Sequence, residues 1–406
     1  MASILDSSVR QPVSGADALV SGHGRALADA LQRHTLEIFP PRAQKPLRLF
    51  TIAEVAKRLG VNPNYLRALA GDKKGPTPTS GPMGRMSYTG DQVLQLRHFL
   101  DGNARSRRYL PVRRPGEHLQ IVAVANFKGG SGKTTTTAHL AQHLALNGYR
   151  VLALDLDPQA SLSALHGFQP EIDVGANETL YGAIRYDDKR RSLKELIRPT
   201  NFPGLHLVPG NLELMDFEFE TPVSLSSSRE GVPAKAFLGR LQQALESVDA
   251  EYDVVLLDCP PQLGYLTMVA LAAATSLLVP IHPQMLDVMS MAQFLQMLGD
   301  VMNHLASAGA KLNYDWVHYL IARYESSDGP QTDMVAFLRS HFGRHVLTNP
   351  MLKSVAVSDA GITKQTIYEV ERKNFTGSTY DRAIEALEAV NGEIEAVICR
   401  AWGRSP

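Results

Sequence analysis

The sequence predicts an α/β protein in which a doubly wound, mostly parallel sheet follows a smaller helical domain. From residue 119 onward, short apolar runs alternate with helical stretches, which is typical of parallel strands joined by crossover helices. A glycine-rich segment at 128–135 separates the first of these runs from its helix. Before it, residues 51–100 favour two short helices around a glycine turn and a third helix further on.

Composition agrees with a globular chain of two or three domains. The 406 residues are 44% hydrophobic and 20% charged, and two cysteines exclude a disulfide framework within one chain. No apolar signal region opens the sequence and no run approaches 18 apolar residues. We therefore expect a cytoplasmic protein without a membrane span.

The formal net charge of zero hides an asymmetry along the chain. Residues 1–120 hold 18 Lys+Arg against 9 Asp+Glu, and the remainder holds 23 against 32. A basic N-terminal part on an acidic body favours nucleic-acid binding by the basic part. Solvated basic surface is the alternative explanation.

The first predicted element is a helix over residues 14–38 within an N-terminal region, 1–45. Leu27, Leu31 and Ile38 fall on one stripe of this helix, and two prolines at 40–41 end it. The stripe could pack on its own domain or on a second subunit, so dimerisation through this helix stays open.

Residues 46–102 form the predicted small helical domain. Thr51 and Glu54 match a capping box and open a helix that runs to a tight turn at Gly60. Asn62 and Pro63 then read as the N-cap and the first residue of a second helix. Two short helices around a glycine turn have the spacing of a helix-turn-helix.

A wing is predicted after the second helix. The Gly/Pro-rich stretch 75–84 precedes a short segment at 85–88 and a third helix at 89–100. This arrangement resembles the winged helix-turn-helix of MerR-type regulators. It implies DNA-binding roles for Asn64, Tyr65, Arg67 and Arg85. A small helical domain that binds no nucleic acid is the alternative. Residues 103–118, with five arginines and two prolines, are typical of a linker.

Six strands are predicted in the remaining domain, 119–406. They lie at 121–127, 150–157, 205–210, 252–259, 276–281 and 316–322. Helices are expected to 147 after the glycine-rich segment, over 236–248, and over 286–305, whereas 221–234 reads as an exposed loop. In such a domain the ligand binds at the carboxyl ends of the strands.

The glycine-rich segment is the strongest functional signal. Its glycines allow the backbone to wrap around phosphate oxygens and point N–H groups at them. Lys133 would reach the β- and γ-phosphates, and the Thr134 hydroxyl would bind Mg²⁺. Nucleotide binding is thus assigned to Lys128, Gly129, Gly130, Ser131, Gly132, Lys133, Thr134 and Thr135.

This segment departs from the strict Walker A pattern. Phe127 stands where that pattern has a glycine, and an additional lysine, Lys128, follows it. The segment therefore resembles the deviant Walker A motif of the ParA/MinD family of P-loop NTPases. The resemblance implies that Lys128 is a catalytic residue that reaches the partner's nucleotide across an ATP-sandwich dimer.

Two acidic segments resemble further motifs of that family. Asp157 in 155–159 matches Walker A′, which implies that it is catalytic and orients the attacking water. Asp258 in 254–261 matches Walker B, which implies that it binds Mg²⁺ through water beside the nucleotide. ATP and Mg²⁺ are the implied cofactors, and positioning and charge stabilisation would carry the rate.

The resemblance extends through 277–291 and 349–398, which look like the RepA partition proteins of repABC-type plasmids. It implies a homodimeric, nucleoid-associated partition ATPase that binds operator and non-specific DNA, represses its own operon, and acts with a ParB-like partner (RepB) at a centromere-like site. Pro283 and Arg323 are implied near the adenine. Lys353, Lys364 and Arg372 are either non-specific DNA contacts or solvated charges.

Three other functions compete with this interpretation. A membrane-associated MinD-like positioning ATPase is disfavoured because the final predicted helix is rich in glutamate. An iron–sulfur reductase is disfavoured because Cys259 and Cys399 do not match its cluster loop, and Cys259 reads as a small buried hydrophobe. A repressor with an inactive nucleotide site is disfavoured because every Walker residue is present. His139 and His143 have the spacing of a metal pair, but we interpret them as packing or solvent-contact residues.

Overall fold

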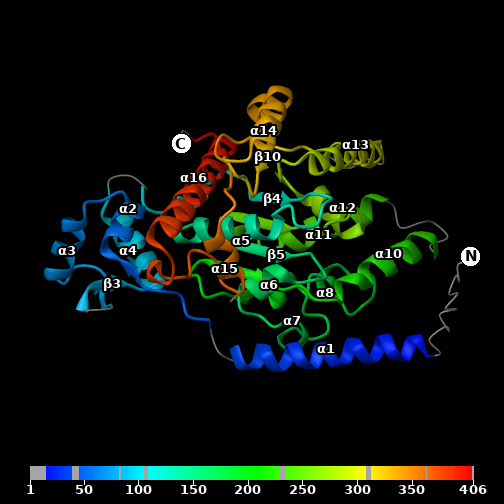
Figure 1. Ribbon diagram of the computed structural model, residues 1–406, viewed down its shortest axis with the longest axis horizontal. Helices are drawn as coiled ribbons and strands as arrows, with labels where there is room; N and C mark the ends of the chain where they lie inside the picture. The colour runs from blue at the N-terminus through cyan, green and yellow to red at the C-terminus, as the bar shows by residue number, and fades with distance from the viewer. Residues whose placement is uncertain are drawn as a thin grey trace, which may run out of the picture. The chain divides into compact units, whose positions relative to one another are not determined.

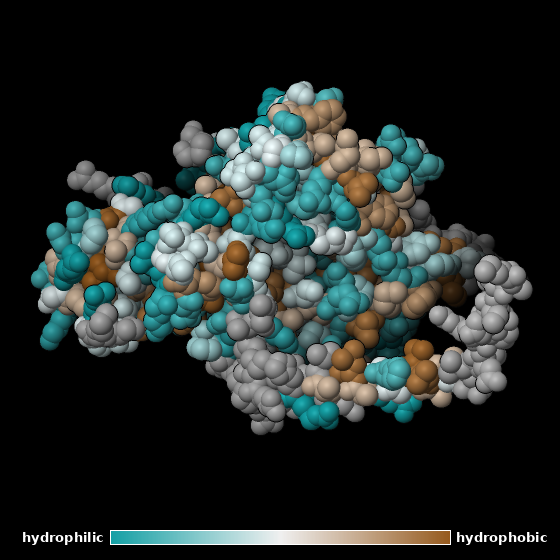
Figure 2. Space-filling model, in the orientation of Figure 1, coloured by the Kyte–Doolittle hydropathy of each residue, from teal (hydrophilic) through white to brown (hydrophobic). Residues whose placement is uncertain are grey.

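The computed structural model describes residues 15–38, 45–81, 84–104, 108–227, 234–307, 312–362 and 364–404. It divides into two compact units, Met1–Lys45 and Pro46–Pro406. In the first unit, α1 (Ala16–Ile38) confirms the predicted helix. Leu19, Val20 and Leu27 are exposed on it, and Figure 2 shows hydrophobic side chains along its surface. The side chains of Leu31 and Ile38 lie outside the described part.

The second unit contains the predicted doubly wound sheet. Its seven strands lie in the order β10-β9-β4-β8-β5-β7-β6, and every pairing is parallel except that of β6 with β7. Figure 1 labels β10, β4 and β5 of this sheet, with α5 beside them. The strands are β4 (Gln120–Val124), β5 (Val151–Asp155), β6 (Arg198–Pro199), β7 (Leu205–Val208), β8 (Val254–Asp258), β9 (Ser276–Ile281) and β10 (Trp316–Ile321). The two-residue edge strand β6 was not predicted.

Helices cover both faces of this sheet. On β4, Val122 and Val124 join the core formed with α5 and α16, whereas Ile121 and Ala123 join the core formed with α11 and α12. The helices of the body are α5 (Lys133–Leu146), α6 (Ser161–Leu165), α7 (Pro170–Asp173), α8 (Tyr181–Ile184), α9 (Leu193–Leu196), α10 (Leu214–Ser227), α11 (Ala234–Glu246), α12 (Tyr265–Ala273), α13 (Met285–Ser307), α14 (Gly329–Phe342), α15 (Val355–Ile362) and α16 (Gly377–Ala401), with 3₁₀ turns η2 (Asp249–Glu251), η3 (Gly343–His345) and η4 (Arg372–Asn374).

The N-terminal part of the second unit follows the predicted element order. It holds β1 (Phe50–Thr51), α2 (Ile52–Leu59), α3 (Pro63–Gly71), β2 (Thr79–Ser80), β3 (Met86–Tyr88) and α4 (Gly90–Asn103). The capping box of Thr51 and Glu54 is formed, and Gly60 ends α2 at a φ of 63°, where a side chain would be strained. The three short strands pair antiparallel in the order β1-β3-β2. The predicted wing residues 82–83 lie outside the described residues.

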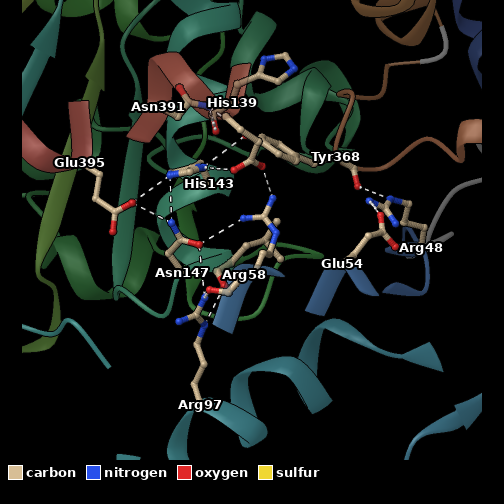
Figure 3. Close-up of polar contacts among 12 residues, drawn as sticks. Arg48, Glu54, Arg58, Arg97, His139, His143, Asn147, Tyr368, Asn391 and Glu395 are labelled. Atoms are coloured by element: carbon tan, nitrogen blue, oxygen red, sulfur yellow. Dashed lines mark hydrogen bonds and ion pairs between the residues drawn. The ribbon is translucent and has the colours of Figure 1, made fainter. Parts of the chain in front are cut away.

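Two arginines join this N-terminal part to the body. Arg97 of α4 donates hydrogen bonds to the Leu146 carbonyl at the end of α5 (3.0 Å) and to the Tyr109 carbonyl (3.1 Å). Arg58 of α2 donates to Asn147 Oδ1 at 3.3 Å, and Figure 3 shows both guanidinium groups directed at Asn147. A cation at the C-terminal end of α5 also complements the helix dipole. The helical domain is therefore anchored on the helix that follows the glycine-rich loop.

Behind these arginines lies a buried polar cluster between α5 and α16. His143 pairs with Glu395 at 3.0 Å and with Glu388 at 3.3 Å, and Arg58 pairs with Glu388 as well (Figure 3). Burial opposes the charged form of His143, but its hydrogen bonds to the two glutamates outweigh burial and raise its pKa. His143 is thus part of an interhelical ion cluster, which corrects the interpretation of simple packing or solvent contact.

The predicted exposed loop at 221–234 is wrong over its first half. Residues 221–227 are the last two turns of α10, which continues through Pro222. Phe217 and Thr221 are fully buried, and the Thr221 hydroxyl donates to the Phe217 carbonyl at 2.6 Å. Packing of this face outweighs the helix-breaking tendency of proline. Residues 228–233 lie outside the described residues.

Two observations bear on membrane contact. Within the described ranges, no helix is both long and apolar enough to cross a bilayer. The apolar side of α16, including Leu387, Val390 and Ile394, is buried in the protein core. This side of the final helix is therefore already occupied by the chain's own residues.

Candidate nucleotide-binding site

The glycine-rich loop connects β4 to α5 at the carboxyl edge of the sheet. Gly130 and Gly132 adopt φ values of 76° and 94°, which only glycine adopts without strain. Asn126 fixes the start of the loop by donating to the Pro280 carbonyl at 2.6 Å and accepting from the Lys128 amide at 3.1 Å. The N-terminus of α5, which opens at Lys133, therefore lies where its free N–H groups can bind an anion.

Lys133 points back into this loop. Lys133 is only 6% exposed, and its Nζ donates to the Lys128 carbonyl at 3.1 Å. Burial lowers the pKa of Lys133, and nearby Asp258 partly opposes that shift. A buried ammonium held by one carbonyl gains most from an added anion, so the site suits phosphate oxygens.

Two carboxylates meet at the ends of adjacent strands. The β5–β8 register places Asp155 beside Asp258, and both are fully buried. Burial raises the pKa of Asp258 well above its usual range, and the neighbouring Asp155 adds to this. Burial likewise raises the pKa of Asp155 to about 6, although hydrogen bonds from Ser163 oppose the shift.

The carboxylate pair fits a divalent cation. The hydroxyl of Thr137 donates to Asp258 Oδ1 at 3.3 Å, while Asp258 Oδ2 is buried and has no hydrogen-bond partner among the described residues. The Thr134 side chain lies close enough to Asp258 to oppose the rise in the pKa of that carboxyl. Mg²⁺ prefers such oxygen ligands together with water and phosphate. The residues predicted for the metal, Thr134 and Asp258, are therefore brought together.

Asp157 lies on the rim of the same edge. Its Oδ1 accepts from the Gln159 amide at 3.0 Å, and its own amide donates to Asp155 Oδ1 at 3.3 Å. Gly210 packs against this turn, because a Cβ there would lie 2.9 Å from the Asp155 carbonyl and 3.2 Å from that of Asp157. The turn that carries Asp157 is thus held from both sides.

Lys128 makes a contact that sequence reasoning missed. It forms an ion pair with Asp287 in the first turn of α13, and its side chain is 42% exposed. Asp287 also accepts from His282 Nδ1 at 2.9 Å. An acidic residue in the first turn after a strand's carboxyl end was the available signal. In the single chain, Lys128 is therefore held by its own subunit.

The two residues implied near the adenine lie at the same edge. Arg323 follows β10 with a φ of 56°, and it donates to the Gly130 carbonyl at 3.1 Å. Pro283 is buried two residues after β9. Contact of either residue with a base stays a prediction.

The residues predicted for DNA are on a different surface. Asn64, Tyr65 and Arg67 are exposed on α3, where Arg67 donates to Asn64 at 2.6 Å, and Arg85 is exposed before β3. The structure does not bring them to the nucleotide edge. Of the basic residues considered for non-specific DNA, Lys353 pairs with Glu325 at 2.7 Å and Arg372 pairs with Asp381 at 2.6 Å.

The cysteines take the places expected of structural residues. Cys259 is buried directly after β8, and burial raises the pKa of its thiol. Cys399 lies in α16 with its sulfur 3.4 Å from the Tyr149 hydroxyl. The two thiols thus belong to different elements of the fold: Cys259 follows the strand β8, and Cys399 lies in the helix α16.

The parallel sheet, the loop at its carboxyl edge and the buried lysine define a P-loop nucleotide-binding protein. Residues 119–309 match the family model described as an AAA domain. The chain is 56% identical over 393 residues to a protein named as a replication protein A of Rhizobium rhizogenes, covering 97% of each chain. It is 31% identical over 360 residues to the protein SopA of Escherichia coli strain K12, covering 87% of this chain and 89% of SopA.

A solved structure titled a partition protein shares the fold, with a TM-score of 0.61 and 18% identity over 92% of this chain and 98% of that one. The chain belongs to the ParA family of plasmid partition ATPases and resembles the RepA proteins of repABC-type plasmids.

Proposed function

We propose that this chain binds and hydrolyses ATP with Mg²⁺ as a homodimer and acts in plasmid segregation. The observation that carries the proposal is the pair of lysines on one loop. Lys133 is buried among phosphate-binding amides, whereas Lys128 is half exposed on the rim. Relatives named for chromosome partitioning support the cellular role.

Each residue of the site has a role in this reaction. The loop amides and Lys133 bind the β- and γ-phosphates, and Thr134 and Asp258 hold the metal. When bound, Mg²⁺ offsets phosphate charge. Asp157, fixed by its turn, accepts a hydrogen bond from water and orients it toward the γ-phosphate.

Lys128 supplies the step that requires two subunits. Its ion pair with Asp287 is partly exposed, so exchange of that carboxylate for the phosphates of a partner's ATP costs little. Charge stabilisation supplied in this way resembles an arginine finger. ATP would then favour the dimer and hydrolysis would release it.

DNA binding belongs to the helical domain. The exposed polar face of α3 carries Asn64, Tyr65 and Arg67, and Arg85 precedes the strand β3. Through these residues the chain would recognise operator DNA and repress its own operon. Partition would further require a ParB-like protein bound at a centromere-like site. The anchoring of α4 on α5 supports coupling between nucleotide binding and DNA binding. The phosphate loop leads into the N-terminus of α5, and the helical domain contacts the C-terminal end of the same helix.

The enzymatic part is tested with three alanine variants of the full chain. Lys133→Ala should weaken ATP binding by about 10²-fold, because a charge-assisted phosphate contact of about 3 kcal/mol is lost. Asp157→Ala should bind ATP and lose turnover, and Lys128→Ala should lose ATP-dependent dimerisation. Lys189→Ala, on an exposed loop, is the matched control. Wild-type turnover in Asp157→Ala would remove that residue from the mechanism.

The DNA part is tested with point variants, since the helical domain packs on the body and its deletion would uncover α5. Arg67→Ala and Asn64→Ala should weaken binding to the operon's promoter by about 1–3 kcal/mol, while ATP affinity is unchanged. Lys74→Ala, whose side chain is exposed and pairs with Asp72, controls for general charge. If all three variants bind the promoter with the affinity of the wild-type chain, recognition by α3 is refuted.

A further inference from the structure

Three charged or titratable side chains form a row beside the phosphate loop, and the mechanism above gives a role to the first of them alone. Lys128 pairs with Oδ1 of Asp287, and Oδ2 of the same carboxylate lies 2.9 Å from Nδ1 of His282. His282 directly follows β9, and Asp287 lies in the first turn of α13. The carboxylate therefore holds a different nitrogen on each of its oxygens.

Exposure falls steeply along this row. The Lys128 side chain is 42% exposed, whereas those of Asp287 and His282 are each 11% exposed. Oδ1 of Asp287 is sealed from solvent, and among the described residues it has no partner besides the ion pair with Lys128. The lysine can move into solvent, but the carboxylate cannot follow it. A buried carboxylate that loses its cation is strongly unfavourable.

The backbone of Lys128 stays in place when its side chain moves. Its amide donates to Asn126 Oδ1 at 3.1 Å, and its carbonyl accepts from Lys133 Nζ at 3.1 Å. The cross-dimer step is therefore a swing of the Lys128 side chain away from Asp287. The cost of that swing depends on which group neutralises the carboxylate afterwards.

His282 can take over this role without moving. In the described part of the chain, Asp287 forms ion pairs with Lys128 and His282 alone. An imidazole gains or loses a proton near neutral pH, and Nδ1 of His282 already faces the carboxylate. No described residue hydrogen-bonds to Nε2, and that atom is not one of the buried polar atoms left without a partner. Nε2 is thus open to a proton from solvent.

The protonation of His282 responds to the departure of Lys128. Burial lowers the pKa of His282, nearby positive charges lower it further, and one carboxylate opposes the shift. The positive groups are Arg323, Lys128 and Lys353, and the carboxylate is Glu325. Arg323 is held by the phosphate-loop backbone at 3.1 Å, and Lys353 by Glu325 at 2.7 Å. Loss of the lysine alone therefore raises the pKa of the imidazole.

We propose that His282 is a positioning residue for Lys128: it orients Asp287 in the single chain, and it binds a proton and neutralises that carboxylate when Lys128 swings to the partner's ATP. This inference rests on the proposed cross-dimer role of Lys128. Each subunit that releases its lysine takes one proton from solvent at Nε2 of His282, and it returns that proton when the lysine comes back. No covalent bond between heavy atoms is made or broken.

The dimer formed with ATP should accordingly weaken as pH rises. The dimer binds more protons than two single chains do, so low pH favours association. The fall occurs between the pKa of His282 in the single chain, which lies below 6.5, and its higher pKa in the dimer. Within this range, log K of association falls by up to about 2 per pH unit, because two sites titrate. A pKa difference of about one unit at each site gives a total loss of about 100-fold.

The test measures dimerisation of the full chain by sedimentation from pH 5.5 to 8.5, with Mg²⁺ and an ATP analogue that is not hydrolysed. The variant is His282→Asn, in which an amide N–H stands near the place of Nδ1 and cannot be protonated. Wild type should dimerise about 100-fold more tightly than this variant at pH 5.5, and equally at pH 8.5. The difference between their pH profiles is the measured quantity, because titration of the nucleotide is common to both chains.

Two further variants keep this result interpretable. Asp287→Asn removes the charge that needs a counter-ion, so its dimer should be tight and should lack the decline assigned to His282. His304→Asn alters an exposed histidine in the last turn of the same helix, α13, and should keep the wild-type profile.

The possible outcomes separate this inference from the proposed function. A wild-type chain that forms no dimer with ATP, or a Lys128→Ala chain that dimerises normally, would refute the proposed cross-dimer step. Normal ATP-dependent dimerisation with the same pH profile in wild type and His282→Asn would overturn the role of His282 alone. Weaker dimerisation of His282→Asn by an equal factor at every pH would show a purely structural role and would also overturn the proton exchange.

Discussion

The contact between Arg97 and α5 leads to a quantitative prediction about how the helical domain is held. Arg97 is 5% exposed, and burial lowers its pKa to about 10, so it is still charged at neutral pH. Its guanidinium reaches across from α4 to the last carbonyl of α5. Arg97→Met removes the donors and keeps most of the side-chain volume.

The expected loss follows from the acceptors left behind. The carbonyls of Leu146 and Tyr109, at 3.0 and 3.1 Å, would lose their donor in a buried setting, at about 1–3 kcal/mol each. The bonds to the Arg58 carbonyl and Asn147, both at 3.4 Å, are too long to add much. Methionine recovers part of the loss, because it avoids the burial of a charge. We therefore expect a net decrease of about 2–3 kcal/mol.

Urea unfolding of the full chain measures this decrease. Limited proteolysis should also show faster cleavage within 104–118 in Arg97→Met, because α4 is released from α5. ATP affinity should be retained, since the phosphate loop lies at the opposite end of α5. Arg67→Met, on the exposed face of α3, is the matched control.

Two results would refute this reasoning. A free energy of unfolding within about 0.5 kcal/mol of wild type, which is the range of ordinary surface changes, would mean that Arg97 does not anchor the domain. A large loss of ATP affinity would mean that the effect reaches the whole body of the protein. Either outcome can be read without knowing any DNA sequence.

Three further predictions concern buried or paired charges. The pKa of His143 is raised in the folded chain. Its contribution to the stability of the fold is therefore fully present below the unfolded pKa of about 6.5 and is lost as pH rises through the higher pKa of the folded state. The melting temperature of His143→Gln, followed against pH, should lack this loss. Asp258 also has a raised pKa, which makes the folded chain less stable as pH rises, so Asp258→Asn should raise the melting temperature at pH 7.5 by about 2–4 °C and lose Mg²⁺-dependent ATP binding. Asp287→Asn frees Lys128 and should increase the ATP-dependent dimer in sedimentation.

Each of these predictions can fail in a distinct way. The histidine account is wrong if His143→Gln and wild type decline in parallel from pH 6 to 9. An unchanged or lower melting temperature in Asp258→Asn would contradict the cost assigned to its burial. A weaker dimer in Asp287→Asn would show that this carboxylate supports association and does not compete with it.

Local chemistry explains which parts of the fold could be predicted from the sequence. The capping box at Thr51, the turn at Gly60 and the phosphate loop are each encoded within about eight residues. Their conformations depend on backbone hydrogen bonds and on glycine, so the residues next to them in the sequence are enough to predict them. Asp258 was also expected at this edge, since strand ends in a parallel sheet share one edge, whereas its buried neighbour Asp155 was given no role.

The missed features depend on contacts between distant segments. Asp287 meets Lys128, and Arg97 meets Leu146, only after the sheet has brought their elements together. The edge strand β6 has two residues and no apolar pattern. Helix α10 continues through a proline because Phe217 and Thr221 are buried on the body. Periodicity and propensity cannot detect such tertiary effects.

The structure also changes what the charge asymmetry means. Part of the basic excess of residues 1–120 faces inward: Arg48 donates to the Tyr368 carbonyl at 3.0 Å, while Arg58 and Arg97 hold α2 and α4 on the body. The guanidinium groups of these three residues are buried against the body, so they cannot contact DNA directly. A count of residues therefore overstates the electrostatic signal of this domain. The relevant quantity for DNA attraction is the number of exposed cations that no carboxylate pairs with.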